Sequence, residues 1–262
     1  MSGPLELLPG GGKGGRRTLA EHAAAELHQL ILSGELPSGT PLRLVELANR
    51  LEMSQMPVRE GLRRLEALGL VEIIPHRGAW VRDLSLDDLR DTHETRLALE
   101  SLAVRAAAEQ FSEDDLQTAA AALAEHLRLS RAEDSVGARQ AHADFHFAIY
   151  RAGGSQWLAR AIEPVWQNSE RYRFGSRPTA FLIERNRAEH QAILDACVAR
   201  DPEAAERALR NHLAGAFQRI TETMTRRAEG DQHGPRRAEG DQHGPRRAER
   251  DQHGLSTQKE SS

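Results

Sequence analysis

The 262-residue chain has a single cysteine, few aromatic residues and no apolar run approaching the ~18 residues of a membrane-spanning helix. The lone Cys197 excludes a disulfide-stabilised scaffold and a zinc site built from cysteines. Because the chain also lacks a basic-then-apolar leader, we expect a soluble, cytoplasmic protein with no membrane partner. Positive charge is not in excess either, since 35 basic and 39 acidic residues give a net charge of −4. That balance excludes a protein that binds nucleic acid through bulk charge alone.

Both ends of the chain are poor in side chains that could form a core. Residues 1–15 are rich in glycine and proline, so we expect them to be disordered. The decapeptide RRAEGDQHGP occupies 226–235 and 236–245, and RRAERDQHGL follows at 246–255. Each copy offers one alanine and, apart from Leu255, no other apolar side chain, which predicts a disordered repeat tail over 226–262. Its regularly spaced histidines leave weak metal binding open as an alternative.

The sequence between the tails changes character near residue 84. The first part, 16–83, is expected to form three helices and a short hairpin, and the second part, 84–225, repeats a helical pattern throughout. The expected helices cover 20–34, 44–53, 57–69, 86–110, 113–131, 136–152, 155–174, 179–199 and 202–224, and the expected strands cover 70–74 and 79–84. The sequence therefore predicts a mostly α fold, with an N-terminal winged helix-turn-helix and a C-terminal all-α antiparallel helical bundle.

Three residues carry local expectations about the helices. Ser54 stands where the N-cap of the third helix belongs. Ser85 begins a possible capping box with Asp88 at the start of the bundle. Gly61 lies inside the third helix, where glycine costs about 0.5–1 kcal/mol relative to alanine.

The second and third expected helices have the features of a DNA-reading pair. Apolar residues give each helix one inner face, and the Met53-Ser54 turn joins the two. Residues 16–83 hold nine arginines and nine acidic residues, so DNA binding must depend on where the arginines lie. A helix in the major groove needs donors that reach base edges and phosphates. The residues in position to supply these contacts are Ser54, Gln55, Arg59 and Arg63 at the helix and His76, Arg77 and Gly78 at the hairpin tip.

The segment SQMPVREGLRRLEALGLVEIIPHRGAWV resembles the GntR family of bacterial transcription regulators. That family commonly has S-R-T-P-V-R-E-A-L here, followed by G-L-V and R-G-x-x-V. The resemblance implies a winged helix-turn-helix that reads DNA with an arginine at each of two positions. Only Arg59 is retained, because Gln55 replaces the other. Glutamine suits adenine where arginine suits guanine, so we hypothesise that Gln55 shifts one half-site position from guanine toward adenine.

Four histidines in the second part form another candidate site. His142 and His146 are four residues apart, so they share one face of a helix. His190 and His212 lie in two later helices. Neutral imidazole is a common metal ligand, and four such groups complete a tetrahedral site. The spacing alone leaves open an ordinary structural role for each histidine.

Residues 86–222 resemble the FCD effector domain of the FadR subfamily of GntR regulators. The segments ADFHFAIYRAGGSQWL and EHQAILDACVARDPEAAERALRNHL carry the resemblance. It implies a divalent metal held by one aspartate and three histidines, with His146, His190 and His212 at the histidine positions. His142 replaces the aspartate, which favours Zn²⁺ or Ni²⁺ over harder ions.

Loss of the aspartate charge would also leave the metal attractive to an anionic ligand, so we expect a small carboxylate effector. Arg96 is the expected cation for a second, bidentate contact to that carboxylate. The alternative for Arg96 is an intrahelical ion pair with Glu100.

These features predict a transcription regulator rather than an enzyme, because no catalytic motif such as H-E-x-x-H accompanies the histidines. The resemblance implies a homodimer on an inverted-repeat operator in double-stranded DNA, and a repressor released by its ligand. An alternative is a metal- or ligand-sensing adaptor whose winged helix binds protein. Operator binding that falls steeply with salt would distinguish the first function from the second.

Overall fold

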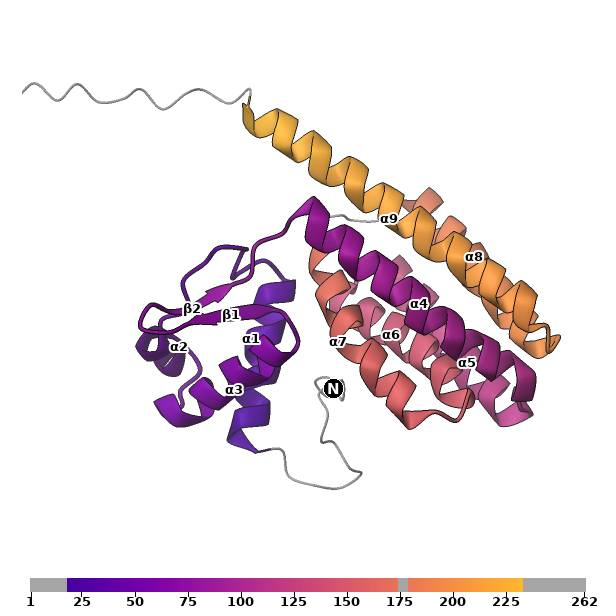
Figure 1. The fold of residues 1–262 in the computed structure, drawn as a ribbon, viewed down its shortest axis with the longest axis horizontal. Coiled ribbons are helices and arrows are strands. Elements are labelled where there is room, and N and C mark those ends of the chain that lie inside the picture. Colours follow the sequence, from indigo (N-terminus) through magenta and orange to yellow (C-terminus); the bar gives the residue numbers. More distant parts are fainter. Residues whose placement is uncertain (1–17, 174–178, 233–262) are drawn as a thin grey trace, which may run out of the picture.

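The computed structural model describes residues 18–173 and 179–232, and in them it has nine helices and one two-stranded sheet. The first three helices and the sheet form an N-terminal unit, and the last six helices form a bundle (Figure 1). The fold class is therefore as predicted. In chain order the elements are α1 (Leu19–Leu32), α2 (Leu44–Arg50), α3 (Gln55–Ala67), β1 (Val71–Ile74), β2 (Gly78–Val81), α4 (Leu86–Gln110), α5 (Glu113–Arg131), α6 (Ser135–Ala152), α7 (Gln156–Tyr172), α8 (Ala180–Val198) and α9 (Pro202–Gln232).

The N-terminal unit is built around the crossing of α1 over α3. Leu27 of α1 and Val58 and Leu65 of α3 are fully buried in one apolar cluster. Gly61 allows this close approach, because a Cβ there would lie 3.0 Å from the backbone nitrogen of Ala24. Gly61 therefore has a packing role besides its expected helix-propensity cost, because the missing side chain lets α1 pack closely against α3.

The hairpin extends from the base of α3 as an antiparallel wing. Val71 pairs with Val81 at its base and Ile74 with Gly78 at its tip. Buried Val71 and Val81 join the apolar cluster of the N-terminal unit. His76 turns the chain with a φ of 62°, which places the tip well away from the core.

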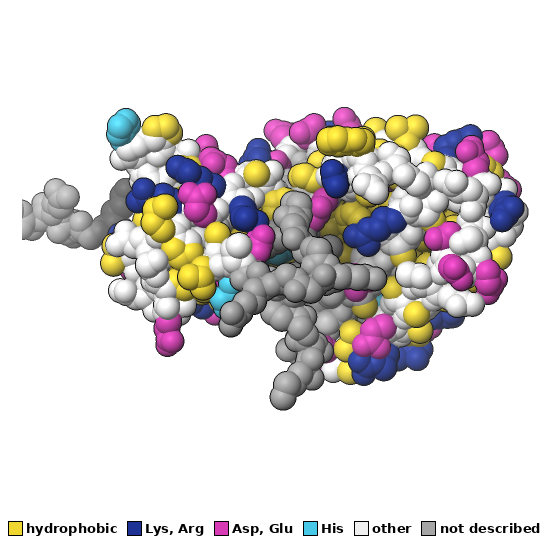
Figure 2. Space-filling model, turned by 90° about the horizontal axis from the view of Figure 1, so that it is seen from below, with side chains coloured by type: hydrophobic (Ala, Val, Ile, Leu, Met, Phe, Trp, Pro, Cys, Tyr) yellow, Lys and Arg dark blue, Asp and Glu magenta, His cyan; other side chains and the backbone are white. Residues whose placement is uncertain are grey.

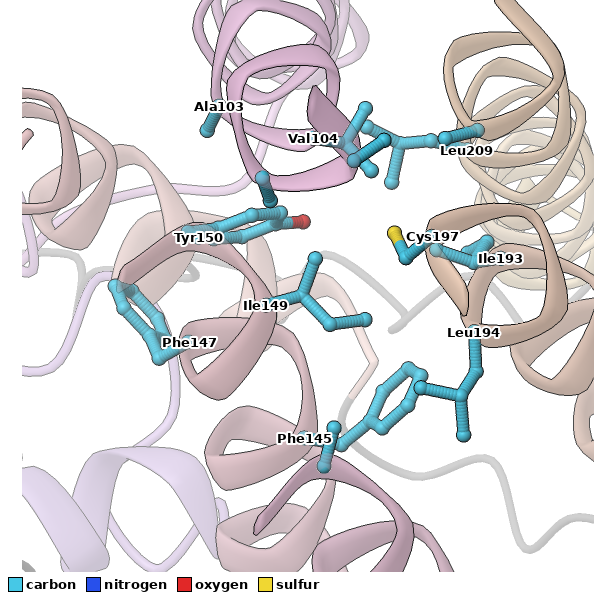
Figure 3. Close-up of a cluster of buried hydrophobic side chains, with 14 of the residues drawn as sticks. Ala103, Val104, Phe145, Phe147, Ile149, Tyr150, Ile193, Leu194, Cys197 and Leu209 are labelled. Atoms are coloured by element: carbon cyan, nitrogen blue, oxygen red, sulfur yellow. The ribbon is translucent and has the colours of Figure 1, made fainter. Parts of the chain in front are cut away.

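The bundle has its own core between α4, α6, α8 and α9. Val104, Ile149, Cys197 and Leu209 come from these four helices and are fully buried (Figure 3). Cys197 lies in this apolar interior, where burial raises the pKa of its thiol to about 12. It is a packed core residue, as its surroundings in the sequence indicate.

The C-terminal end of α7 holds the N-terminal unit against the bundle. The Arg171 guanidinium donates to the carbonyl of Gly69 at 3.1 Å and to that of Asp83 at 3.2 Å, and it also bonds to the carbonyl of Arg82. The Tyr172 hydroxyl bonds to the Asp88 carboxylate and accepts from the backbone N–H of Ser85 at 3.5 Å. Helix α7 of the bundle is thus hydrogen-bonded to the segment that connects the two units, through Arg171 and Tyr172.

Three local expectations need correction. Ser54 occupies the N-cap position of α3, but its side chain makes no capping hydrogen bond. Ser85 caps α4 by accepting from the N–H of Asp88, yet the Asp88 carboxylate turns to Tyr172 and Asn168 instead of completing the box. Helix α9 continues to Gln232, so the first repeat begins as helix rather than as a disordered tail. The N-terminal residues 1–15 and the rest of the repeats lie outside the described residues.

Across the described part of the chain, no helix combines the length and the apolar character needed to cross a membrane.

The Gly61 crossing predicts opposite effects for alanine at two helical glycines. In Gly61→Ala the new methyl group meets the α1 backbone, so we expect the free energy of unfolding of the N-terminal unit to fall by about 1 kcal/mol or more. Gly215→Ala is the matched control, because there the nearest atom is the flexible end of Arg219. It should raise stability by about 0.5–1 kcal/mol. Scanning calorimetry of both variants measures this, and a gain for Gly61→Ala would contradict the packing described.

Candidate functional site

The outer face of α3 presents the polar residues that the sequence singled out. Gln55, Arg59 and Arg63 are all exposed, while Val58, Leu62 and Leu65 on the opposite face are buried. Arg63 is paired with Glu60 at 3.2 Å, and both side chains remain largely in solvent. Exposed pairs of this kind are weak, so the guanidinium can exchange its partner for a phosphate.

The wing tip adds a second exposed polar group. His76, Arg77 and Gly78 are all exposed, at the far end of the hairpin from the core. Figure 2 shows that basic side chains on the N-terminal unit are interspersed with acidic ones. This fits a contact made by particular side chains rather than by a uniformly basic surface.

The structure brings all four predicted histidines of the bundle to one point. His142 and His146 come from α6, His190 from α8 and His212 from α9, and each is at most 4% exposed. One ring nitrogen from each lies within 4.8 Å of the corresponding nitrogens of the others. Four imidazoles at this spacing can hold a metal ion, with limited movement to reach ligand distances of about 2.0–2.1 Å.

Two of these rings already have the tautomer that a metal ligand requires. Nδ1 of His212 lies 3.0 Å from the Glu189 carboxylate and therefore carries the proton. Nδ1 of His146 lies 3.1 Å from the Tyr150 hydroxyl, which gives its own proton to Glu100. The Nε2 atoms of both rings are buried without any hydrogen-bond partner. Unpartnered buried lone pairs are costly, and a bound cation would satisfy them.

His142 is held differently from the other histidines. The Arg173 guanidinium lies 3.3 Å from its Nδ1, and arginine can only donate. The ring proton is therefore on Nε2, which lies 3.1 Å from Nε2 of His190. To coordinate a metal through Nε2, His142 would have to carry its proton on Nδ1 instead. Arg173, which donates to Nδ1, would then have to move away.

Burial keeps the histidines neutral. Desolvation lowers the pKa of His142, His146 and His190 well below the usual value, and neighbouring positive groups lower it further. The pKa of His212 is also lowered by burial, although the Glu189 carboxylate opposes this. Neutral imidazole is the form that binds metals, so the cluster does not have to lose charge first.

A buried polar network joins the histidines to α4 and α7. The ion pair with Glu100, which was the alternative for Arg96, is present: the Arg96 Nε lies 2.6 Å from the Glu100 carboxylate, with both side chains buried. The same guanidinium donates to the Ser169 hydroxyl at 3.0 Å and lies 4.5 Å above the ring of Trp166. The Trp166 ring in turn contacts His142 and His146, with centroids 5.3 and 4.9 Å apart. Arg96 thus makes the intrahelical pair and also borders the histidine cluster.

Three residues near this centre could not be identified from the sequence. His126 of α5 brings its ring within 5.1 Å of the His142 ring, while its Nδ1 bonds to the Ala138 carbonyl. Trp166 and Arg173 reach the cluster because α7 turns that face inward. Only the three-dimensional packing of α5 and α7 reveals these contacts, since none of the three follows a motif spacing.

Comparison with known protein families matches both parts of the chain. Residues 19–81 match the family described as bacterial regulatory proteins, gntR family. Residues 91–215 match the FCD domain. The first match spans the N-terminal unit and the second spans most of the bundle.

Relatives that cover more than three quarters of the chain are named as transcription regulators. The HTH-type transcriptional regulator BphR of Paraburkholderia xenovorans is 32% identical over 79% of this chain and 86% of its own length. The probable D-xylose utilization operon transcriptional repressor of Paenarthrobacter nicotinovorans is 34% identical over 76% of this chain and 87% of its own.

Solved structures share the fold. E. coli McbR/YncC matches with a TM-score of 0.69 and 23% identity, covering 80% of this chain and all of its own. A putative GntR regulator from Rhodococcus matches with a TM-score of 0.63 and 24% identity, covering 78% of this chain and 97% of its own. The two family matches and the regulators more than 30% identical, together with the exposed α3 face, identify a DNA-binding transcription regulator. The chain belongs to the GntR family of bacterial transcription regulators and carries an FCD domain in its helical bundle.

Proposed function

We propose that the protein is a repressor of the FadR subfamily whose affinity for its operator is set by a small carboxylate bound at a metal centre in the bundle. It would act as a homodimer on an inverted repeat in the cytoplasm of a bacterium, with one α3 in each half-site. The observation that carries the proposal is the convergence of four buried, neutral imidazoles on one point, two of them with unpartnered Nε2 atoms.

The donor set favours Zn²⁺ or Ni²⁺. All four donors are imidazole nitrogens, which suit these ions better than Mg²⁺ or Mn²⁺. Glu189 and Tyr150 orient two of the rings from behind, the support that metal-binding histidines usually have. His146, His190 and His212 would be the first three ligands, and His142 would be the fourth if Arg173 moves away.

A carboxylate is the effector that this environment favours. The buried Arg96 and the partly buried Arg173 are balanced by Glu100 and Glu170, so a divalent ion would add uncompensated positive charge. Coulomb attraction between buried opposite charges is strong, and an anionic ligand would offset that excess. Arg96 and Arg173 are the two guanidinium groups placed to hold it.

Helix α7 provides the route from the effector site to the DNA. Ser169 and Arg173 face the buried centre, whereas Arg171 and Tyr172 contact the segment that joins the wing to α4. A small rotation or shift of α7 would therefore move both sets of contacts together. In a dimer, such a shift would change the spacing of the two recognition helices by an amount coupled to ligand binding.

The proposed function makes three predictions, of which the first concerns base preference. With Gln55 in the major groove, selected operators should contain adenine at one position per half-site, and Gln55→Arg should change that preference to guanine by about 1–3 kcal/mol. Site selection from a random DNA library measures this for both proteins. Guanine selected by the unaltered protein, with no change in Gln55→Ala, would contradict the assignment.

The second prediction concerns the effector site. Calorimetry with a panel of small carboxylates should show binding to the zinc-loaded protein that is lost after chelation. It should also weaken by about tenfold or more in the double variant Arg96→Gln/Glu100→Gln, because a charge-assisted contact is removed. The double substitution avoids leaving Glu100 buried without its partner. Carboxylate binding that survives both changes would refute a metal- and Arg96-dependent site.

The third prediction concerns the connection through α7. Arg171→Ala should reduce the effect of the carboxylate on operator affinity, which we expect to correspond to ~1–3 kcal/mol in the unaltered protein. Carboxylate binding to the DNA-free protein should change by less than about twofold, since Arg171 faces the linker rather than the centre. Arg128→Ala is the matched control, because Arg128 pairs with Glu125 on the exposed face of α5. Gel shifts with and without ligand measure the effect, and equal responses in all three proteins would contradict this route.

A further inference from the structure

A small cavity lies between α4, α7 and α9, next to the candidate metal centre. Its lining includes two cations, Arg96 and Arg173, and a set of apolar side chains, namely Leu89, Leu213, Ala216, Phe217 and Ile220. The cavity encloses about 20 Å³, which is room for about one water molecule. The remaining lining residues are Thr92, His93 and Ser169, so cations and apolar side chains make up most of the lining.

The hydroxyl groups that border this cavity already have partners within the protein. The Thr92 oxygen accepts from the Asn168 amide at 2.8 Å. The Ser169 hydroxyl donates to the Trp166 carbonyl at 2.7 Å and accepts from Arg96. A ligand rich in hydroxyl groups would have to bury them against apolar side chains, and each unpaired buried hydroxyl is costly.

Two stacked rings line the cavity. The His93 ring of α4 and the Phe217 ring of α9 have centroids 4.5 Å apart and planes 21° apart, and both residues are half-buried. Parting of these rings would widen the cavity and add an aromatic surface to its walls. A planar apolar group is the shape that fits between or against such rings.

We infer that the effector is a monocarboxylate with an apolar, hydroxyl-free body, and that Phe217 selects it. This inference rests on the proposed carboxylate effector and specifies its chemical class. The carboxylate lies at Arg96 and Arg173, on the side nearest the histidines, and the body lies against Leu213, Phe217 and Ile220. A second carboxylate or a polyhydroxylated chain would be desolvated against these walls without a partner.

Calorimetry of the zinc-loaded full-length protein with three probes tests the inference. Benzoate has the carboxylate and a planar apolar body, acetate has the carboxylate alone, and gluconate has the carboxylate on a polyhydroxylated chain. We expect benzoate to bind at least about tenfold more tightly than either of the others. Phe217→Ala should remove most of that advantage, and Phe217→Leu should retain part of it. Phe181→Ala is the matched control, because Phe181 is 74% exposed on α8 and does not border the cavity.

The outcomes separate this inference from the function it depends on. Benzoate preference that is lost in Phe217→Ala and kept in Phe181→Ala supports it. Equal or tighter binding of acetate or gluconate overturns the apolar class and leaves the carboxylate effector standing. Benzoate preference unchanged in Phe217→Ala overturns the role of Phe217 and the location of the body. Zinc binding without binding of any of the three probes overturns the carboxylate effector and this inference together.

Discussion

Desolvation of four imidazoles at the centre of the helical bundle is the constraint on which the rest of the structure depends. Burying this many polar rings within 4.8 Å of one another favours their neutral forms and demands a partner for every nitrogen. Glu189 and Tyr150 supply two of those partners, and Arg173 supplies a third. Nε2 of His146, Nε2 of His212 and Nδ1 of His190 have no hydrogen-bond partner within the protein, and the proposed metal centre would satisfy the two Nε2 atoms. The polar groups of α4, α7 and α8 are arranged around that requirement.

Helix α7 links this constraint to the DNA-reading unit because its C-terminal turns contact both. Trp166, Ser169 and Arg173 touch the buried network on one side. Arg171 and Tyr172 bind the backbone around the linker on the other. A rigid helix transmits a displacement over this short distance without a chain of intervening rearrangements. The Arg171 contacts are to backbone carbonyls, so they depend on geometry rather than on which side chains the linker carries.

Much of the fold could be predicted from the sequence, because helix periodicity and capping residues are local signals. Helices α4 to α8 begin and end within a few residues of the expected positions, whereas α9 extends well beyond its expected end, to Gln232. The convergence of four histidines, His142, His146, His190 and His212, could be predicted because the residues resemble family motifs, and each of these histidines lies within a helix. Contacts that depend on how helices cross could not be predicted from the sequence. They are the close approach of α1 at Gly61, the face that α7 turns inward, and the contact of Arg173 with His142. Glu189 illustrates the difference, since it is adjacent to His190 in sequence but supports His212 in space.

The most direct test of the account is the metal content of the full-length protein with His233, His243 and His253 replaced by glutamine, so that only the bundle can retain metal. After incubation with zinc or nickel and desalting, elemental mass spectrometry should find about one ion per chain. In the same protein with His190→Gln and His212→Gln added, the ion should be lost. Retention of no metal by the first protein, or equal retention by both, would contradict a metal centre built from these four histidines.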